Sequence, residues 1–145
     1  MIGEGISDEQ WAIRILPRQP DAVGEEGRLN WGAFAPSDVE KSAPPVRVSV
    51  WDESLGIARI RAIVGATDDR PAYRMNVGEL RLLGRSRPGL DVVRDPGGAP
   101  SDLSESEKAG HWGIQRLERQ RGEGRPAWKA LLLDVANLCS RVDPK

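Results

Sequence analysis

The sequence has very few of the residues that form covalent cross-links or act as catalytic bases near neutral pH. It contains one cysteine, one histidine, one tyrosine and one phenylalanine among 145 residues. A single cysteine cannot form an internal disulfide, and one Cys with one His cannot supply the four ligands of a structural zinc site. We therefore predict a protein without internal disulfides and without a bound metal.

Long apolar runs are also missing. The densest apolar stretch is Ala130–Leu133, which Asp134 ends, whereas a membrane-spanning helix needs about 20 predominantly apolar residues. The first residues, Met1–Glu4, lack the basic and then apolar pattern of a signal peptide. These features predict a cytoplasmic protein that does not contact the membrane.

The glycine-rich signatures of nucleotide and hydrolase sites do not occur either. The sequence has no Gly-x-x-x-x-Gly-Lys, no Gly-x-Gly-x-x-Gly and no Gly-x-Ser-x-Gly. These are the signatures of P-loop proteins, of Rossmann dinucleotide sites and of the nucleophile elbow, respectively. We predict that the protein carries no cofactor.

Charged residues are abundant, and the two signs nearly balance. There are 21 Lys and Arg against 22 Asp and Glu, so the net charge is −1 and offers no global attraction for nucleic acid. Four of the basic residues are lysine and the other 17 are arginine. This bias is typical of a GC-rich genome. Alternatively, it suits bidentate contacts with phosphate or carboxylate groups.

The clearest secondary structure lies near the C-terminal end. Between Pro126 and Val142 the apolar residues form one helical stripe, and these residues are Trp128, Leu131, Leu132, Val135, Leu138, Cys139 and Val142. Pro126 suits the first helical turn, and Pro144 is expected to stop the helix. The alternating Val46, Val48 and Val50 predict a strand, and we expect these valines to lie beneath the helix.

Shorter elements complete the predicted fold. Further strands are predicted at Trp11–Leu16, Ala72–Met75, Leu90–Arg94 and His111–Leu117. Residues 54–64 fit a helix, which we favour, or one strand of a hairpin. Asn76 and Glu79 predict the start of a short helix that ends before Gly84, and Ser104 with Glu107 predicts another cap. Leu29–Ala35 is predicted as a short strand or an irregular packed segment, and Ser37–Pro45 as a loop.

Together these elements predict one α+β domain over residues 1–145. Its sheet is expected to be mainly antiparallel, with five to six short strands and three helices, and the C-terminal amphipathic helix docks on the sheet. The order of the Val46–Trp51 strand, a helix, Asn76–Arg81 and Leu90–Pro96 resembles that of small bacterial proteins. This resemblance implies no activity.

His111 is the first candidate for a catalytic residue, because imidazole exchanges protons near neutral pH. With Arg116 and Arg119 it could cleave RNA: the imidazole would take the 2′-OH proton, and the guanidinium groups would stabilise the phosphate. The alternative is a hydrogen-bonded histidine in a polar loop, because no second proton-transfer group accompanies it.

The absence of a complete catalytic set favours a non-enzymatic accessory domain that binds another protein. Trp31 and Trp112 lie beside glycines and are candidate contact residues, since tryptophan is enriched at interface hot spots. Arg85 and Arg87 belong to a second basic run and complete the predicted contact set. Nucleic acid is a less favoured partner. The alternative function is a small RNA-directed enzyme or toxin that uses His111 and the arginine clusters.

Overall fold

The computed structural model describes residues 5–16, 22–23, 28–42, 44–66 and 70–142. The helices, including three short 3-10 helices (η), and the strands follow in chain order: β1 (Trp11–Ile15), η2 (Trp31–Phe34), α1 (Asp38–Ser42), β2 (Arg47–Asp52), η3 (Glu53–Leu55), α2 (Ile57–Val64), β3 (Ala72–Asn76), α3 (Val77–Leu83), β4 (Asp91–Arg94), η4 (Pro96–Gly98), α4 (Glu105–Ala109), β5 (His111–Gln115), α5 (Arg125–Ala136) and β6 (Ser140–Arg141). Among these residues, none of the helices combines the length and apolar character that crossing a bilayer requires.

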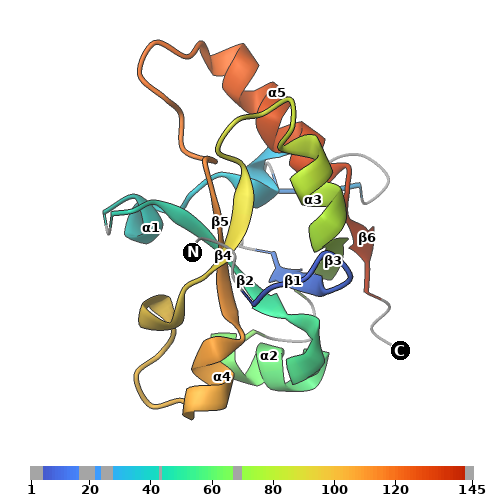
Figure 1. The fold of residues 1–145 in the computed structure, drawn as a ribbon, viewed down its shortest axis with the longest axis vertical. Coiled ribbons are helices and arrows are strands. Elements are labelled where there is room, and N and C mark those ends of the chain that lie inside the picture. Colours follow the sequence, from blue (N-terminus) through green and yellow to red (C-terminus); the bar gives the residue numbers. More distant parts are fainter. Residues whose placement is uncertain (1–4, 17–21, 24–27, 43, 67–69, 143–145) are drawn as a thin grey trace.

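The described strands form one antiparallel sheet in the order β4-β5-β2-β1-β3-β6 (Figure 1). The first strand of the chain lies inside this sheet, where Ile13 is opposite Trp51 of β2 on one side and Arg74 of β3 on the other. The predicted small α+β domain with a mainly antiparallel sheet is therefore confirmed. The described residues contain five α-helices rather than the predicted three.

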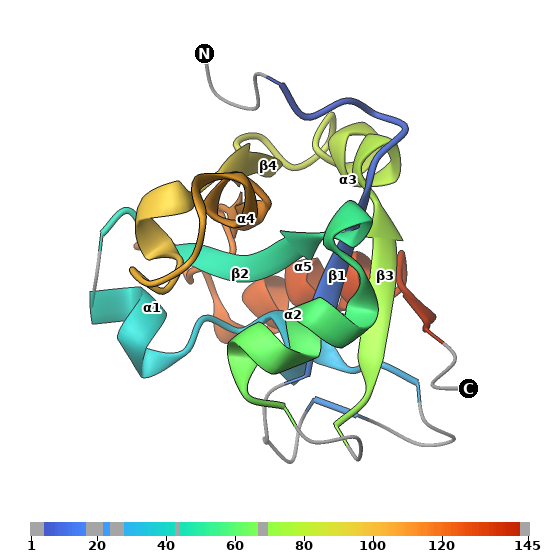
Figure 2. The same cartoon turned by 90° about the horizontal axis from the view of Figure 1, so that it is seen from below.

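One face of the sheet is closed by α3, α5 and η2. Figure 2 shows α5 behind the sheet and α2 in front of it. Leu131, Leu132 and Val135 of α5 are buried in one cluster with Val48 and Val50 of β2. The predicted docking of the C-terminal helix over the β2 valines is confirmed for these two, and Val46 precedes the strand.

The second face is covered only in part, by α2 and by Leu55, Ala99 and Leu103 from other segments. Ile60 of this helix is fully buried and packs in a second cluster with Ile13, Trp51 and Ala72. Gly65, in the left-handed conformation with φ of 69°, ends the helix after Val64. The helical interpretation of residues 54–64 is thus confirmed from Ile57 onward, and the hairpin alternative is wrong.

The C-terminal helix is shorter than its apolar stripe predicts. It ends at Ala136, because the chain turns there and β6 pairs with β3 through Ser140 and Arg141. Leu138 and Cys139 lie beyond the helix and are half-buried against the same core, whereas Val142 packs against the cluster on the second face. Pairing with the open edge of β3 replaces further helical turns, and Pro144 lies outside the described residues.

Two segments contain short helices that the sequence did not predict. The predicted loop Ser37–Pro45 is wrong in part, because it holds α1, whose first turn has Ser37 and Glu40 as reciprocal caps. Leu29–Ala35 contains η2, for which the Asn30 side chain accepts a hydrogen bond from the Trp31 N–H. The predicted caps Asn76 and Ser104 are confirmed at α3 and α4.

Candidate functional site

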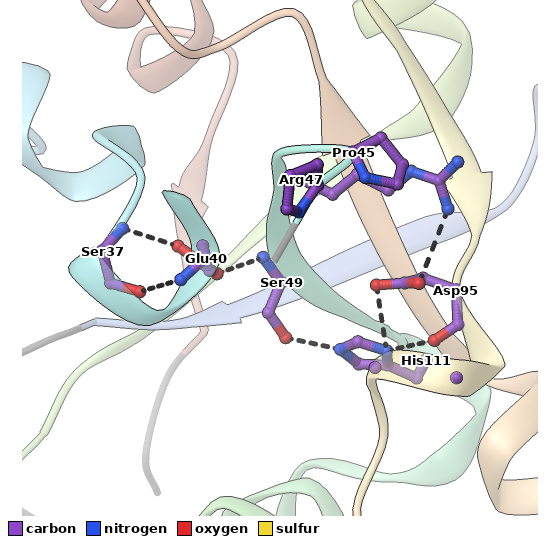
Figure 3. A pocket seen from close by; sticks show the side chains of 10 residues that line it. Ser37, Glu40, Pro45, Arg47, Ser49, Asp95 and His111 are labelled. Carbon is purple, nitrogen blue, oxygen red and sulfur yellow. Dashed lines mark hydrogen bonds and ion pairs between the residues drawn. The ribbon is translucent and has the colours of Figure 1, made fainter. Parts of the chain in front are cut away.

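A cavity of about 530 Å³ opens on the second face of the sheet, beside the part that α2 covers. Its floor comes from β2 and β5, and its walls come from the α1 region and from η4. Figure 3 shows the residues that line it, which are Ser37, Glu40, Pro44, Pro45, Arg47, Ser49, Asp95, Gly97, Gly98 and His111. This cavity joins segments from three distant parts of the sequence.

Ser49 lies where β2 separates from β1. The two strands pair at Trp51 and Asp52, and beyond that point side chains bind the Ser49 peptide. Glu40 Oε2 accepts a hydrogen bond from the Ser49 N–H at 2.9 Å, and Arg14 Nη1 donates to the Ser49 carbonyl at 2.8 Å. Burial lowers the pKa of the Arg14 guanidinium, and the nearby Glu40 carboxylate acts in the opposite direction. Two charged side chains therefore hold the Ser49 backbone in place of a strand.

The Ser49 hydroxyl contacts His111 directly. Ser49 Oγ lies 2.7 Å from His111 Nε2, and His111 Nδ1 lies 2.6 Å from the Asp95 carbonyl oxygen. A carbonyl oxygen only accepts hydrogen bonds, so Nδ1 carries the hydrogen. In the neutral imidazole Nε2 is then an acceptor, and the Ser49 hydroxyl donates to it. This is the geometry in which a histidine takes a proton from a serine nucleophile.

The strands next to His111 fix its ring. His111 is opposite Trp51 in β2, and the two ring centroids lie 4.5 Å apart. On the other side, the Asp95 N–H donates to the His111 carbonyl at 2.9 Å. Only 3% of His111 is exposed. Gly113, two positions along β5, is opposite Ser49 and has no side chain that would separate the imidazole from the hydroxyl.

The Asp95 carboxylate lies between His111 and Arg47. Its Oδ2 is 3.8 Å from His111 Nδ1, and its Oδ1 is 3.5 Å from Arg47 Nη1. Gly98 allows this wall to approach closely, because a Cβ there would lie 2.5 Å from Asp95 Oδ2 and 3.1 Å from His111 Cε1. The Asp95 carbonyl orients the imidazole, and the carboxylate supplies negative charge beside it.

A smaller hollow of about 220 Å³ adjoins the cavity and shares Ser37, Glu40 and Ser49 with it. It lies at the separation of β1 and β2, and its other lining residues are Arg14, Ile15, Trp51, Val64 and Arg70. Ser49 therefore borders both hollows.

The structure places His111 in this cavity but brings neither predicted arginine to it. Arg116 and Arg119 follow the end of β5, and Arg116 is about 17 Å along an extended strand from His111. Arg116 Nη2 contacts Glu123 Oε2 at 3.2 Å, and Arg119 Nε donates to the Glu123 carbonyl at 2.8 Å. A hydrogen bond from the Gln120 backbone N–H lowers the pKa of the Glu123 carboxyl, and Arg116 lowers it further. The predicted RNA-cleaving set is not assembled.

The four residues predicted to contact a partner have different environments in the structure. Trp112 is 2% exposed and packs in the core, so the prediction that it reaches a partner is wrong. Trp31 is half-buried, with its ring 5.9 Å from that of Trp128. Arg87 pairs with Asp134 at 2.7 Å, and Arg85 is exposed. Partner binding through Trp31, Arg85 and Arg87 stays a prediction.

The sequence drew attention to His111 but not to Ser49, Asp95 or Arg47. Arg47, Ser49 and Trp51 alternate with buried valines, so their placement on the opposite face of β2 follows from the strand pattern. Nothing local indicates that β5 lies beside β2, since Ser49 and His111 are 62 positions apart. Comparisons with family models, curated proteins and solved structures found no match.

Proposed function

We propose that this protein is a small hydrolase that cleaves esters or related acyl compounds, with Ser49 as the nucleophile and His111 as the general base. The observation that carries this proposal is the 2.7 Å contact between Ser49 Oγ and His111 Nε2, at the floor of an open cavity. The sequence favoured a non-enzymatic role because His111 had no evident partner, and Ser49 now supplies one.

The proposed reaction follows from the hydrogen bonds. Ser49 Oγ attacks the substrate carbonyl carbon while its proton moves to His111 Nε2, and the resulting imidazolium keeps its Nδ1–H on the Asp95 carbonyl oxygen. When the bond to the leaving group breaks, His111 returns the proton to the leaving oxygen. Water then attacks the acylated Ser49 with His111 again as base, and releases the acid.

The backbone supports on Ser49 favour this role. A nucleophile works best when its position is fixed before the substrate arrives. Glu40 and Arg14 hold both polar groups of the Ser49 peptide, and Glu40 is itself fixed by the Ser37 N–H at 2.8 Å. The hydroxyl is thus presented to the cavity by a rigid backbone.

The test is hydrolysis of 4-nitrophenyl acetate by the purified protein and by three variants. We expect Ser49→Ala and His111→Gln to lower kcat/KM by about 10²–10⁴-fold, while Ser101→Ala, at an exposed serine, leaves it unchanged. A fluorophosphonate probe should label Ser49, as located by peptide mass spectrometry.

The same variants show whether a loss is chemical or structural. Removing the Ser49 hydroxyl deletes one hydrogen bond. The free energy of unfolding of Ser49→Ala should therefore lie within about 1.5 kcal/mol of that of the parent protein. Hydrolysis that persists in Ser49→Ala, or labelling of another residue, would show that Ser49 is not the nucleophile.

A further inference from the structure

We propose that the Arg47 guanidinium binds a carboxylate of the substrate, so that the cavity prefers esters that carry a negative charge near the scissile bond. This inference rests on the proposed function, because it names the substrate class of the same site. Its first support is position. Arg47 precedes Ser49 by two residues on β2, so both side chains project from the same face and start about 7 Å apart.

The second support is the weak pairing of Arg47 within the protein. Its hydrogen bonds are from Nη1 to the Arg94 carbonyl and to Asp95 Oδ1, both at 3.5 Å, whereas an ordinary N–H···O hydrogen bond is about 2.7–3.2 Å long. Its Nε is buried without a hydrogen-bond partner. By contrast, Arg14 and Arg70 donate to backbone carbonyls at 2.8–3.0 Å. Among the described arginines that line the two hollows, Arg47 retains the most unused donor capacity.

The third support is the space that Gly113 gives to the Arg47 side chain. Gly113 lies across from Ser49 on β5, and a Cβ at this position would be 2.7 Å from Arg47 Cβ. The Arg47 stem therefore lies over the floor of the cavity, and Figure 3 shows its guanidinium on the Asp95 side. Only a glycine at 113 is compatible with this placement.

The two carboxylates of the cavity are engaged in contacts within the protein. Arg47 is therefore the charged side chain that is available to bind a substrate. Both Glu40 oxygens accept backbone N–H groups, from Ser37 and Ser49. Asp95 binds Arg47 through Nη1 alone, so Nη2 stays open to a substrate carboxylate. The planar guanidinium fork matches the geometry of a carboxylate.

The experiment compares two chromogenic acetate esters that differ in one charge. They are 4-acetoxy-3-nitrobenzoate and its uncharged carboxamide, in which the carboxylate or amide lies across the ring from the ester. If Arg47 forms a charged hydrogen bond of ordinary strength with the carboxylate, kcat/KM should be about tenfold or more higher for the anionic ester than for the carboxamide. We expect Arg47→Gln to lower kcat/KM far more for the anionic ester than for the carboxamide, and so to abolish this preference. Arg47→Lys should keep part of it, and Arg85→Gln, at an exposed arginine, should keep all of it.

Other outcomes overturn the inference in distinct ways. Equal rates for both esters in the parent protein would exclude the carboxylate subsite, while Ser49-dependent hydrolysis would still uphold the proposed function. Equal losses on both esters in Arg47→Gln would assign Arg47 to the reaction itself rather than to recognition.

A binding measurement separates the two proposals if no hydrolysis is found. The product 4-hydroxy-3-nitrobenzoate is titrated into Ser49→Ala and into Ser49→Ala with Arg47→Gln, with tryptophan fluorescence as the readout. Binding that requires Arg47 and weakens with salt would support the subsite even if the hydrolase proposal fails. Binding that is absent, or equal in both variants, would contradict it.

Discussion

The two faces of the sheet are formed by the same strands, but one face is buried in an apolar core and the other is partly open. On one face α3, α5 and η2 bury Val48 and Val50 of β2 in a continuous apolar core. On the other face α2 covers Trp51 but does not reach Ser49 and Arg47, which line the cavity. The difference shows how one short strand serves stability and a site at once: its valines are buried, and its alternate residues are left for chemistry.

The polar site lies where the strand pairing also fails. Near Trp51, β2 is hydrogen bonded to β1 and to β5, whereas at Ser49 only β5 pairs with it. A backbone group without a partner is costly unless a side chain binds it, and here Glu40 and Arg14 do so. The cavity therefore lies at the point where β1 and β2 separate, and the side chains that line it there also bind the unpaired backbone.

The largest effect is expected from a change on the closed face. Leu131→Ala removes a side chain that is 1% exposed in the core cluster, so it should lower the free energy of unfolding by about 2–5 kcal/mol. Leu133→Ala on the same helix is the control, because Leu133 is 39% exposed and should change stability little. Urea unfolding of both variants measures the difference. Equal losses would mean that the packing of α5 differs from that described above.

A smaller loss is expected from the open face. Glu40→Ala leaves the Ser37 and Ser49 N–H groups without their acceptor and should cost about 1–3 kcal/mol. Glu105→Ala, at a side chain that is 96% exposed, serves as the control. Amide hydrogen exchange gives a local readout, since Ser49 should lose protection in Glu40→Ala. Retained protection would show that another group holds this N–H.

Near neutral pH the smallest effect concerns the thiol at the edge of the closed face. Burial raises the pKa of Cys139 to about 12, whereas an unfolded thiol titrates near 8.5. Between these values the unfolded chain has lost the proton that the folded protein keeps, so stability should fall as the pH rises above about 8.5. Cys139→Ala should remove this dependence. At pH 8 a thiol reagent should label the native protein slowly and the urea-unfolded protein fast, and rapid native labelling would contradict the assigned burial.

Periodic apolar patterns predicted most of the fold, because burial on one face leaves a direct trace in the sequence. Val48, Val50, Leu131 and Val135 are examples. Five of the predicted strands and the predicted caps agree with the structure, whereas Leu29–Ala35 contains η2. The end of α5 was misjudged because Leu138 and Cys139 continue the helical stripe although they pack from a turn. An apolar stripe indicates which residues are buried, but it does not specify the backbone conformation at those residues.

The candidate site could be predicted only in part. His111 was singled out by its chemistry, but its partners depend on strand order, which no local pattern specifies. Ser49 and Asp95 meet His111 because β5 lies between β2 and β4. Arg116 and Arg119 are close to His111 in sequence and far from it in the fold, because an extended strand carries them away.

The placement of β1 inside the sheet has a consequence for how the chain folds. Its neighbours β2 and β3 come later in the sequence, and β2 gains its other neighbour only when β5 is available, 62 residues after Ser49. Sheets built from such distant pairings fold more slowly than those built from consecutive hairpins. During synthesis β2 keeps an open edge until β5 leaves the ribosome. Formation of the Ser49–His111 contact would then be a late event, and the appearance of the site would report that β5 has joined the sheet.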